Sequence, residues 1–149
     1  MDAVITPIAR LDGDALAPLI REAVEDGYGF VQTLWDEYES GKNRFDTPGA
    51  ALLGVYESGR LIGVGGVQQD PYLKRADAGR VRHVYVLREF RRHGVGKQLL
   101  EALIAHARQH FDLLTLRTNT EAAAAFYVAL GFSDAPEGRD ATHWMRLND

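Results

Sequence analysis

The sequence predicts one α+β domain, with a mixed, mostly antiparallel sheet of about seven strands flanked by about four helices. Three strand-like segments follow one another in the middle of the chain, and strand and helix patterns alternate after them. Such an order is typical of mixed sheets. The 149 residues, 46% of them hydrophobic, form one domain, residues 1–149, with no linker or repeat. A chain of this length buries about two-thirds of its unfolded surface.

The N-terminal part predicts one strand and two helices. Residues 3–9 are apolar enough for a strand, and an acidic turn follows them. Its aspartates can cap a helix over residues 12–26, which carries apolar residues at helical spacing. Gly27 and Gly29 interrupt this pattern, and a second helical pattern covers residues 30–40. A polar loop then leads into the sheet.

The middle of the chain predicts three strands and the longest helix. Residues 50–57 and 61–69 form a hairpin through the turn at 58–60, which contains a glycine. Residues 81–87 are rich in β-branched and aromatic residues, as a strand requires. Residues 95–110 then place apolar side chains three and four positions apart, which gives an amphipathic helix.

The C-terminal part predicts a short buried strand, an alanine-rich helix and a closing pair of strands. The strand covers residues 113–116 and the helix residues 120–130, which Gly131 terminates. Residues 132–133 and 142–147 are expected to pair antiparallel.

Composition limits the classes of function. The chain has no cysteine, so disulfides, thiol catalysis and cysteine metal sites are excluded. It lacks a signal-peptide pattern and an apolar run long enough to span a bilayer, so we expect a cytoplasmic protein without membrane contact. The net charge of −4 argues against a nucleic-acid partner. No His, Asp and Glu spacing suggests a metal.

The charge is unevenly distributed. Residues 74–97 hold eight lysines and arginines against two acidic residues, whereas residues 1–73 hold twelve acidic residues against five basic ones. The first zone suits an anionic cofactor and the second would attract a cationic amine. The alternative is that most of these charges are solvated surface.

The turn from Arg91 to Lys97 joins the third central strand to the long helix and has the properties of a phosphate-binding site. A helix start offers unpaired N–H groups and the positive end of the helix dipole. Gly94 and Gly96 allow an anion to approach the backbone closely, and the basic residues around them add charge. The alternative is a glycine-capped helix with solvated arginines. Neither the G-x-x-x-x-G-K-S/T nor the G-x-G-x-x-G pattern is present.

Two segments together resemble the GNAT superfamily of N-acetyltransferases. The order Arg91-x-x-Gly94-x-Gly96, between a strand and an amphipathic helix, is similar to its acetyl-CoA signature. Downstream, Tyr127-Val-Ala-Leu-Gly131-Phe132 is similar to the end of a helix that members commonly carry. The resemblance covers residues 50–147, while residues 1–49 match only in element order. It implies a GNAT-like sheet and acetyl-CoA as cosubstrate.

The resemblance also implies a cofactor site in the strand, turn and helix of residues 83–110. The strand would pair its backbone with the pantetheine arm, and the turn would hold the pyrophosphate. Many members place an asparagine at the position of Thr120, whereas here Asn119 stands one residue earlier. The residues implied to bind acetyl-CoA are Val84, Tyr85, Val86, Arg91, Arg92, His93, Gly94, Val95, Gly96, Lys97 and Asn119.

Catalysis requires a proton donor for the leaving sulfur and a way to deprotonate the amine. By resemblance, Tyr127 is the donor; the alternative is a core aromatic residue. The base is less determined. His83 has the most suitable intrinsic pKa, although a lone histidine on a strand is more often structural. Carboxylates near the expected cleft edges (Glu25, Asp26, Asp36, Glu37 and Asp70) or ordered water are alternatives.

The predicted function is transfer of an acetyl group from acetyl-CoA to a primary amine, directly in a ternary complex, since no cysteine is present to carry the acyl group. Residues 27–49 would cover the acceptor, a small molecule or peptide that the sequence does not identify. The alternatives are a non-catalytic acyl-CoA sensor, transfer of another acyl group, and simple core packing of the aromatic residues in 27–49. The resemblance also implies that the chain can form a homodimer.

Overall fold

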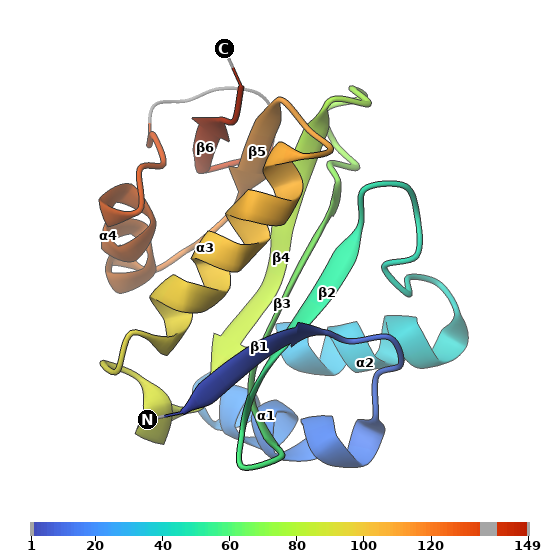
Figure 1. The fold of residues 1–149 in the computed structure, drawn as a ribbon, viewed down its shortest axis with the longest axis vertical. Helices are drawn as coiled ribbons and strands as arrows, with labels where there is room; N and C mark the ends of the chain where they lie inside the picture. Colours follow the sequence, from blue (N-terminus) through green and yellow to red (C-terminus); the bar gives the residue numbers. More distant parts are fainter. Residues whose placement is uncertain (1, 135–139, 149) are drawn as a thin grey trace.

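The computed structural model describes residues 2–134 and 140–148 (Figure 1). In these ranges one six-stranded sheet has the order β1-β2-β3-β4-β5-β6. All neighbouring strands are antiparallel except β4 and β5, which are parallel. This confirms the predicted mixed, mostly antiparallel sheet with four α-helices. The elements are β1 (Ala3–Pro7), α1 (Gly13–Glu25), α2 (Phe30–Ser40), β2 (Ala51–Glu57), β3 (Arg60–Gln69), β4 (Ala78–Val86), the 3-10 helix η1 (Arg88–Phe90), α3 (Val95–Arg108), β5 (Leu113–Leu116), α4 (Glu121–Ala129) and β6 (His143–Arg146).

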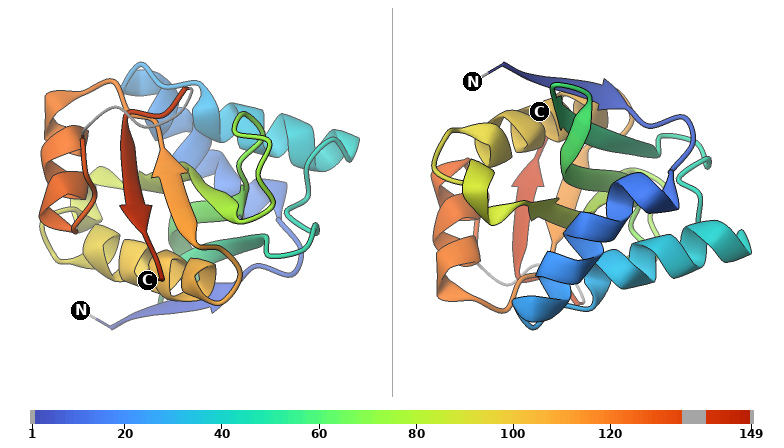
Figure 2. Two further views of the ribbon diagram at one scale, coloured as in Figure 1. Left: turned by 90° about the horizontal axis from the view of Figure 1, so that it is seen from above. Right: turned by 90° about the horizontal axis from the view of Figure 1, so that it is seen from below.

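The helices cover both faces of the sheet. Figure 2 shows α1 and α2 on one face and α3 on the other. A Cβ added at Gly65 of β3 would lie 3.0 Å from Leu103 of α3, whereas one at Gly66 would lie 2.5 Å from Phe45 on the opposite side. Adjacent residues of one strand therefore face different layers, as the two-residue period of a strand requires. The predicted apolar stripe of α3 is buried against the sheet.

Local capping explains where several helices begin and end. The side chain of Asp12 accepts a hydrogen bond from the backbone N–H of Asp14 (3.0 Å) at the start of α1. Thr120 does the same for Ala123 (3.1 Å) at the start of α4. Such caps each stabilise a helix by about 1 kcal/mol. Gly131, predicted to end the alanine-rich helix, has the expected left-handed backbone with φ of 106°.

Two strand predictions differ in detail from the structure. The predicted strand at 132–133 is a single bridge between Ser133 and Trp144, so the described residues contain six named strands. The turn predicted around Pro136 to Gly138 lies outside the described residues. The third central strand begins at Ala78 and not at Val81, because Ala78, Gly79 and Arg80 pair with β5. This pairing joins segments far apart in the sequence and has no local signature.

The pairing of β4 determines the shape of the site. Residues 78–80 of β4 pair with 113–115 of β5, and in the described part of the chain no residue of β5 pairs with β4 beyond Arg80. On its other side β4 continues to pair with β3 as far as Val86, with a bulge that sets His83 and Val84 opposite the single residue Gly65. His83 has a φ of 61°, as the bulge requires. The strands β4 and β5 therefore separate and leave one edge of β4 without a partner.

Candidate active site

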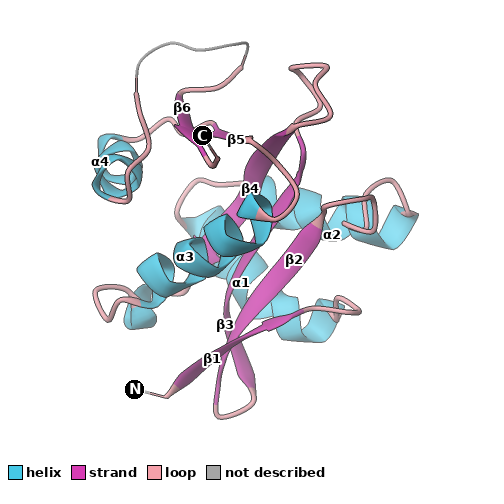
Figure 3. Cartoon of the chain, turned by 45° about the horizontal axis from the view of Figure 1, so that its top comes forward, coloured by secondary structure: helices cyan, strands magenta, loops and turns pink. Residues whose placement is uncertain are grey.

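A cleft of about 570 Å³ occupies the space between the separating strands. Val84, Tyr85 and Val86 line it from the unpaired edge of β4, as predicted for the strand that meets the cofactor. Gly96 contributes from the start of α3 and Tyr127 from α4. Figure 3 shows α4 apart from α3, on the side of the sheet where β5 and β6 lie. Residues from both segments that carry the resemblance, the turn before α3 and the end of α4, therefore line one cleft.

The turn before α3 presents backbone groups at one end of this cleft. Gly94 is the N-cap of α3, with a φ of 79° that disfavours other residues, and no side chain caps the helix. No atom lies within 4 Å of a Cβ built at Gly94, and a Cβ at Gly96 would only meet Phe126 at 3.6 Å. Arg92, His93 and Lys97 are exposed, whereas Val95 is buried in the core. Only the backbone of Val95 is therefore available to a phosphate.

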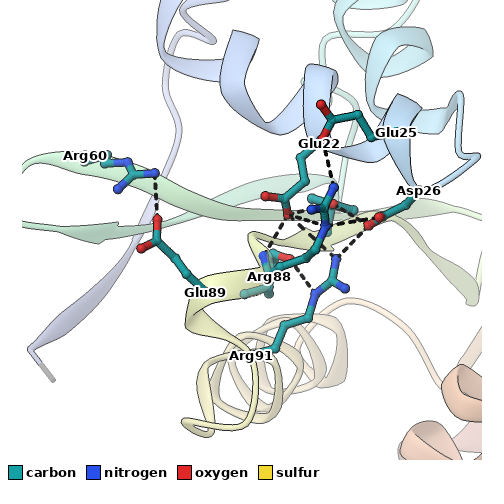
Figure 4. A network of polar contacts seen from close by, with 9 residues as sticks. Glu22, Glu25, Asp26, Arg60, Arg88, Glu89 and Arg91 are labelled. Carbon is teal, nitrogen blue, oxygen red and sulfur yellow. Dashed lines mark hydrogen bonds and ion pairs between the residues drawn. The ribbon is translucent and has the colours of Figure 1, made fainter.

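Arg91 makes contacts that the sequence did not predict (Figure 4). Its Nε donates a hydrogen bond to the backbone oxygen of Val86 (2.9 Å), and Nη2 donates to Asp26 (3.3 Å) at the end of α1. Its guanidinium also lies over the ring of Tyr85, 5.1 Å from the centroid. Arg91 thereby joins α1, β4 and the turn, although it still lines the cleft.

The acidic residues at the end of α1 form one network with these groups (Figure 4). Arg88 binds Glu25 (2.9 Å) and Asp26 (3.1 Å), and the Tyr85 hydroxyl donates to Glu22 (2.9 Å) and Asp26 (2.8 Å). The hydrogen bond from Tyr85 is the largest cause that lowers the pKa of Asp26. Glu25 and Asp26, the two carboxylates that were alternatives for the base in this region, both form ion pairs with Arg88, and the lowered pKa of Asp26 makes that residue a poor proton acceptor.

Tyr127 lies in the wall of the cleft and is 8% exposed. Its ring packs edge-on against Phe126 and Phe132, with centroids 5.1 and 5.7 Å away. Burial raises the pKa of its hydroxyl to about 12, so the group stays protonated at neutral pH. In the described part of the chain the hydroxyl has no hydrogen-bond partner. Tyr127 is thus a core aromatic residue that also lines the cleft, with a hydroxyl that stays protonated.

His83 lies on the bulge of β4 and is 7% exposed. Its Nδ1 is 3.0 Å from the backbone oxygen of Phe30, which accepts only, so Nδ1 carries the proton and Nε2 has a free lone pair. Burial, together with the positive charge of Arg82, lowers the pKa of His83 to about 4. Nε2 is buried and has no hydrogen-bond partner in the described residues. His83 is therefore neutral at physiological pH.

Asn119 lines the cleft, one residue before Thr120. Thr120 also lines the cleft, and its side-chain oxygen accepts the capping hydrogen bond from the backbone N–H of Ala123 at the start of α4. The shift by one residue seen in the sequence thus leaves a polar amide in the cleft.

The model of the acetyltransferase (GNAT) family matches residues 16–132, more than three quarters of the 149 residues. The chain belongs to the GNAT family. GNAT enzymes take an acetyl group from acetyl-CoA and transfer it to an amine.

Solved structures agree with this membership. This GNAT protein is 31% identical to a provisionally assigned acetyltransferase from Exiguobacterium sp. 255-15, over 98% of this chain and 94% of that one, with a TM-score of 0.85. A GNAT acetyltransferase from Staphylococcus aureus Mu50 shares the fold at 17% identity and a TM-score of 0.78, over 99% and 100% of the two chains. The ribosomal-protein-S18-alanine N-acetyltransferase from Escherichia coli also shares the fold, at 19% identity and a TM-score of 0.71, over 99% of this chain and 96% of that one.

The residues of this GNAT protein fit the cofactor of the family. The unpaired edge of β4 can bind the amides of an extended arm, and the uncapped start of α3 can bind its phosphates. The open space at Gly94 and Gly96 is what a bulky anion at the backbone needs. Two of the predicted cofactor residues have other contacts in the structure: the Val95 side chain is buried in the core, and Arg91 forms an ion pair with Asp26 (3.3 Å).

Several residues of the GNAT cleft were not predicted. Tyr28 and Phe30, from the segment predicted to cover the acceptor, line the cleft, whereas Leu34 of the same segment is buried in the core. Further lining residues include Tyr72, Arg80, Arg82 and Arg117. The alternation of Arg80 and Arg82 on one strand was a signal for two of them, because alternate residues share a face.

No group of three or more His, Asp and Glu side chains able to hold a metal occurs in residues 2–134 and 140–148. No helix in these ranges is long and apolar enough to span a membrane.

Proposed function

We propose that this GNAT protein transfers an acetyl group from acetyl-CoA directly to a primary amine while both are bound. The observation that supports it is the separation of β4 from β5. It leaves a free strand edge that leads at one end to an uncapped, glycine-bearing helix start and faces a buried, protonated tyrosine. A strand edge binds an extended ligand through its backbone, and a helix start binds its phosphates.

Acetyl-CoA would be held by Val84 to Val86 along its arm and by the backbone of residues 94–97 at its pyrophosphate. Arg92, His93 and Lys97, all exposed beside the turn, would add charge or hydrogen bonds. Arg91 would mainly hold the turn against α1, because its guanidinium binds Val86 and Asp26. Asn119 would contribute an amide from the β5 side of the cleft.

When bound, acetyl-CoA supplies the thioester carbonyl that the amine attacks and the sulfur that leaves. The Tyr127 hydroxyl holds the proton that the leaving sulfur requires, since its raised pKa keeps it protonated. A pKa of about 4 makes His83 a weak base for an ammonium group. Its role would be to hold Phe30 at the cleft through the hydrogen bond from Nδ1, while an ordered water molecule carries the proton of the amine away.

The test measures thiol release from acetyl-CoA over a panel of amines, together with equilibrium binding of acetyl-CoA. We expect the Tyr127→Phe variant to lose about 10²–10⁴-fold in kcat, the usual contribution of a positioned acid, while its affinity for acetyl-CoA changes less than about twofold. The Tyr56→Phe variant, altered on β2, is the matched control and should keep both values.

Two results would contradict the proposal. An unchanged kcat in the Tyr127→Phe variant would remove Tyr127 from the reaction. Tight binding of acetyl-CoA without thiol release for any amine would support the non-catalytic sensor instead.

A further inference from the structure

The charged side chains that line the cleft are all positive. In the described residues they are Arg80, Arg82, Arg91 and Arg117, and no aspartate or glutamate lines it. An acceptor that is only a cation, such as a polyamine, would therefore meet repulsion along the whole cleft. The acidic residues of α1 do not change this, because Arg88 and Arg91 already bind them.

Three of the arginines lie away from the turn that precedes α3. Arg80 is the last residue of β4 that pairs with β5, and its partner is Thr115. Arg82 lies two residues after Arg80, and Arg117 lies two residues after Thr115. Val86 lies six positions after Arg80 on the strand, on the order of 20 Å at the usual rise, and four positions after Arg82, on the order of 13 Å. These arginines are therefore remote from the pyrophosphate end, and Tyr28, Phe30 and Tyr72 line the cleft with them.

The charge of these arginines is only partly balanced. Arg80 is 6% exposed, forms a buried ion pair with Asp70 (3.5 Å) and donates a hydrogen bond from Nη2 to the backbone oxygen of Asp140 (2.7 Å), so its charge is the best balanced of the three. Arg117 reaches Asp140 only at 4.0 Å, with both side chains more than half exposed, so water screens the pair strongly. Arg82 is half-buried and forms no ion pair with a described residue, and its charge acts on His83.

We propose, building on the acetyl-transfer function above, that the acceptor is an amine that also carries an anionic group, a carboxylate or a phosphate. Guanidinium groups bind both anions through paired hydrogen bonds. Arg82 would be the main contact, since it forms no ion pair with a described residue, and Arg117 would be a second one. The aromatic side chains would contact the apolar part of the acceptor.

The experiment compares kcat/KM for amines matched in all but the anion. Each of several L-amino acids is paired with its amide, and O-phosphoethanolamine is paired with ethanolamine. We expect the wild-type protein to prefer the anionic member of one set by roughly tenfold to a hundredfold, as for a charge-assisted hydrogen bond. The set that shows the preference separates a carboxylate from a phosphate acceptor.

Three variants test whether the arginines of the cleft cause this preference for anionic acceptors. Arg82→Gln should reduce the ratio between anionic and neutral acceptors at least tenfold, and Arg117→Gln should reduce it less, because Arg117 is more exposed. Arg10→Gln removes the same charge from an exposed position outside the cleft and should keep the ratio. Arg117→Gln also tests the proposal if Arg82→Gln does not fold.

Failure of this inference and failure of acetyl transfer give different results. Equal or better use of the neutral acceptors, or an unchanged ratio in both variants, overturns the anionic acceptor but leaves acetyl transfer intact. Absence of thiol release with every acceptor overturns acetyl transfer. In that case a thermal shift by the anionic amines that is lost in Arg82→Gln supports the anion site, and its absence overturns it.

Discussion

The neutral state of His83 predicts a specific dependence of stability on pH. In the folded protein its pKa is lowered to about 4, whereas an unfolded histidine titrates near 6.5. Between these values the unfolded chain binds a proton that the folded protein does not. The free energy of unfolding should therefore decrease as the pH falls through this window. The difference in pKa corresponds to about 3 kcal/mol in the limit, and to roughly 2 kcal/mol at pH 4.5.

The assay is urea unfolding at pH 7.0, 5.5 and 4.5 for the wild-type protein and for His83→Gln, which has no titrating group at this position. His93→Gln removes an exposed histidine of the turn and is the matched control. We expect the wild-type protein and His93→Gln to lose roughly 2 kcal/mol more than His83→Gln between pH 7.0 and 4.5. A pH-independent effect of the substitution on stability cancels, because only the changes in the free energy of unfolding between pH values are compared. Parallel slopes for all three proteins would refute the buried, neutral histidine and its free Nε2.

Two further predictions concern the turn and the network behind it. Gly96→Ala should stabilise α3 by up to about 1 kcal/mol, because alanine favours a helix, and the added methyl group meets Phe126 only at 3.6 Å. The same substitution should weaken coenzyme A binding about tenfold, because the methyl group covers the backbone. Urea unfolding measures the change in stability and calorimetry the change in affinity. An unchanged affinity would mean that the phosphates bind elsewhere. Asp26→Asn should strengthen coenzyme A binding a few-fold, since Arg91 loses its ion pair, and weaker binding in the titration would show that the ion pair positions Arg91 for the cofactor.

The features that the sequence predicted well depend on local patterns. The apolar stripe of α3, the glycine turn before it and the glycine that ends α4 each need only a few neighbouring residues. Helical periodicity and glycine conformations act over such short distances. They predicted the helices and most strands of the fold.

The features that were missed depend on contacts between distant segments. The bulge that gives His83 a φ of 61° requires the register with β3, and its bond to Phe30 spans 53 residues. Arg91 meets Asp26 across 65 residues, so its basic position next to the glycines predicted only a phosphate contact. Arg82 and Arg117 come together in one cleft because β4 and β5 run parallel.

The most direct test of the acetyl-CoA site is amide hydrogen exchange with and without coenzyme A. We expect slower exchange in peptides that contain residues 84–86 and 94–97, where backbone groups lie on the unpaired edge of β4 and at the start of α3. Exchange in the hairpin of β2 and β3 should stay unchanged. Saturating coenzyme A that leaves 84–86 and 94–97 unprotected, or protects another region instead, would contradict the proposed site.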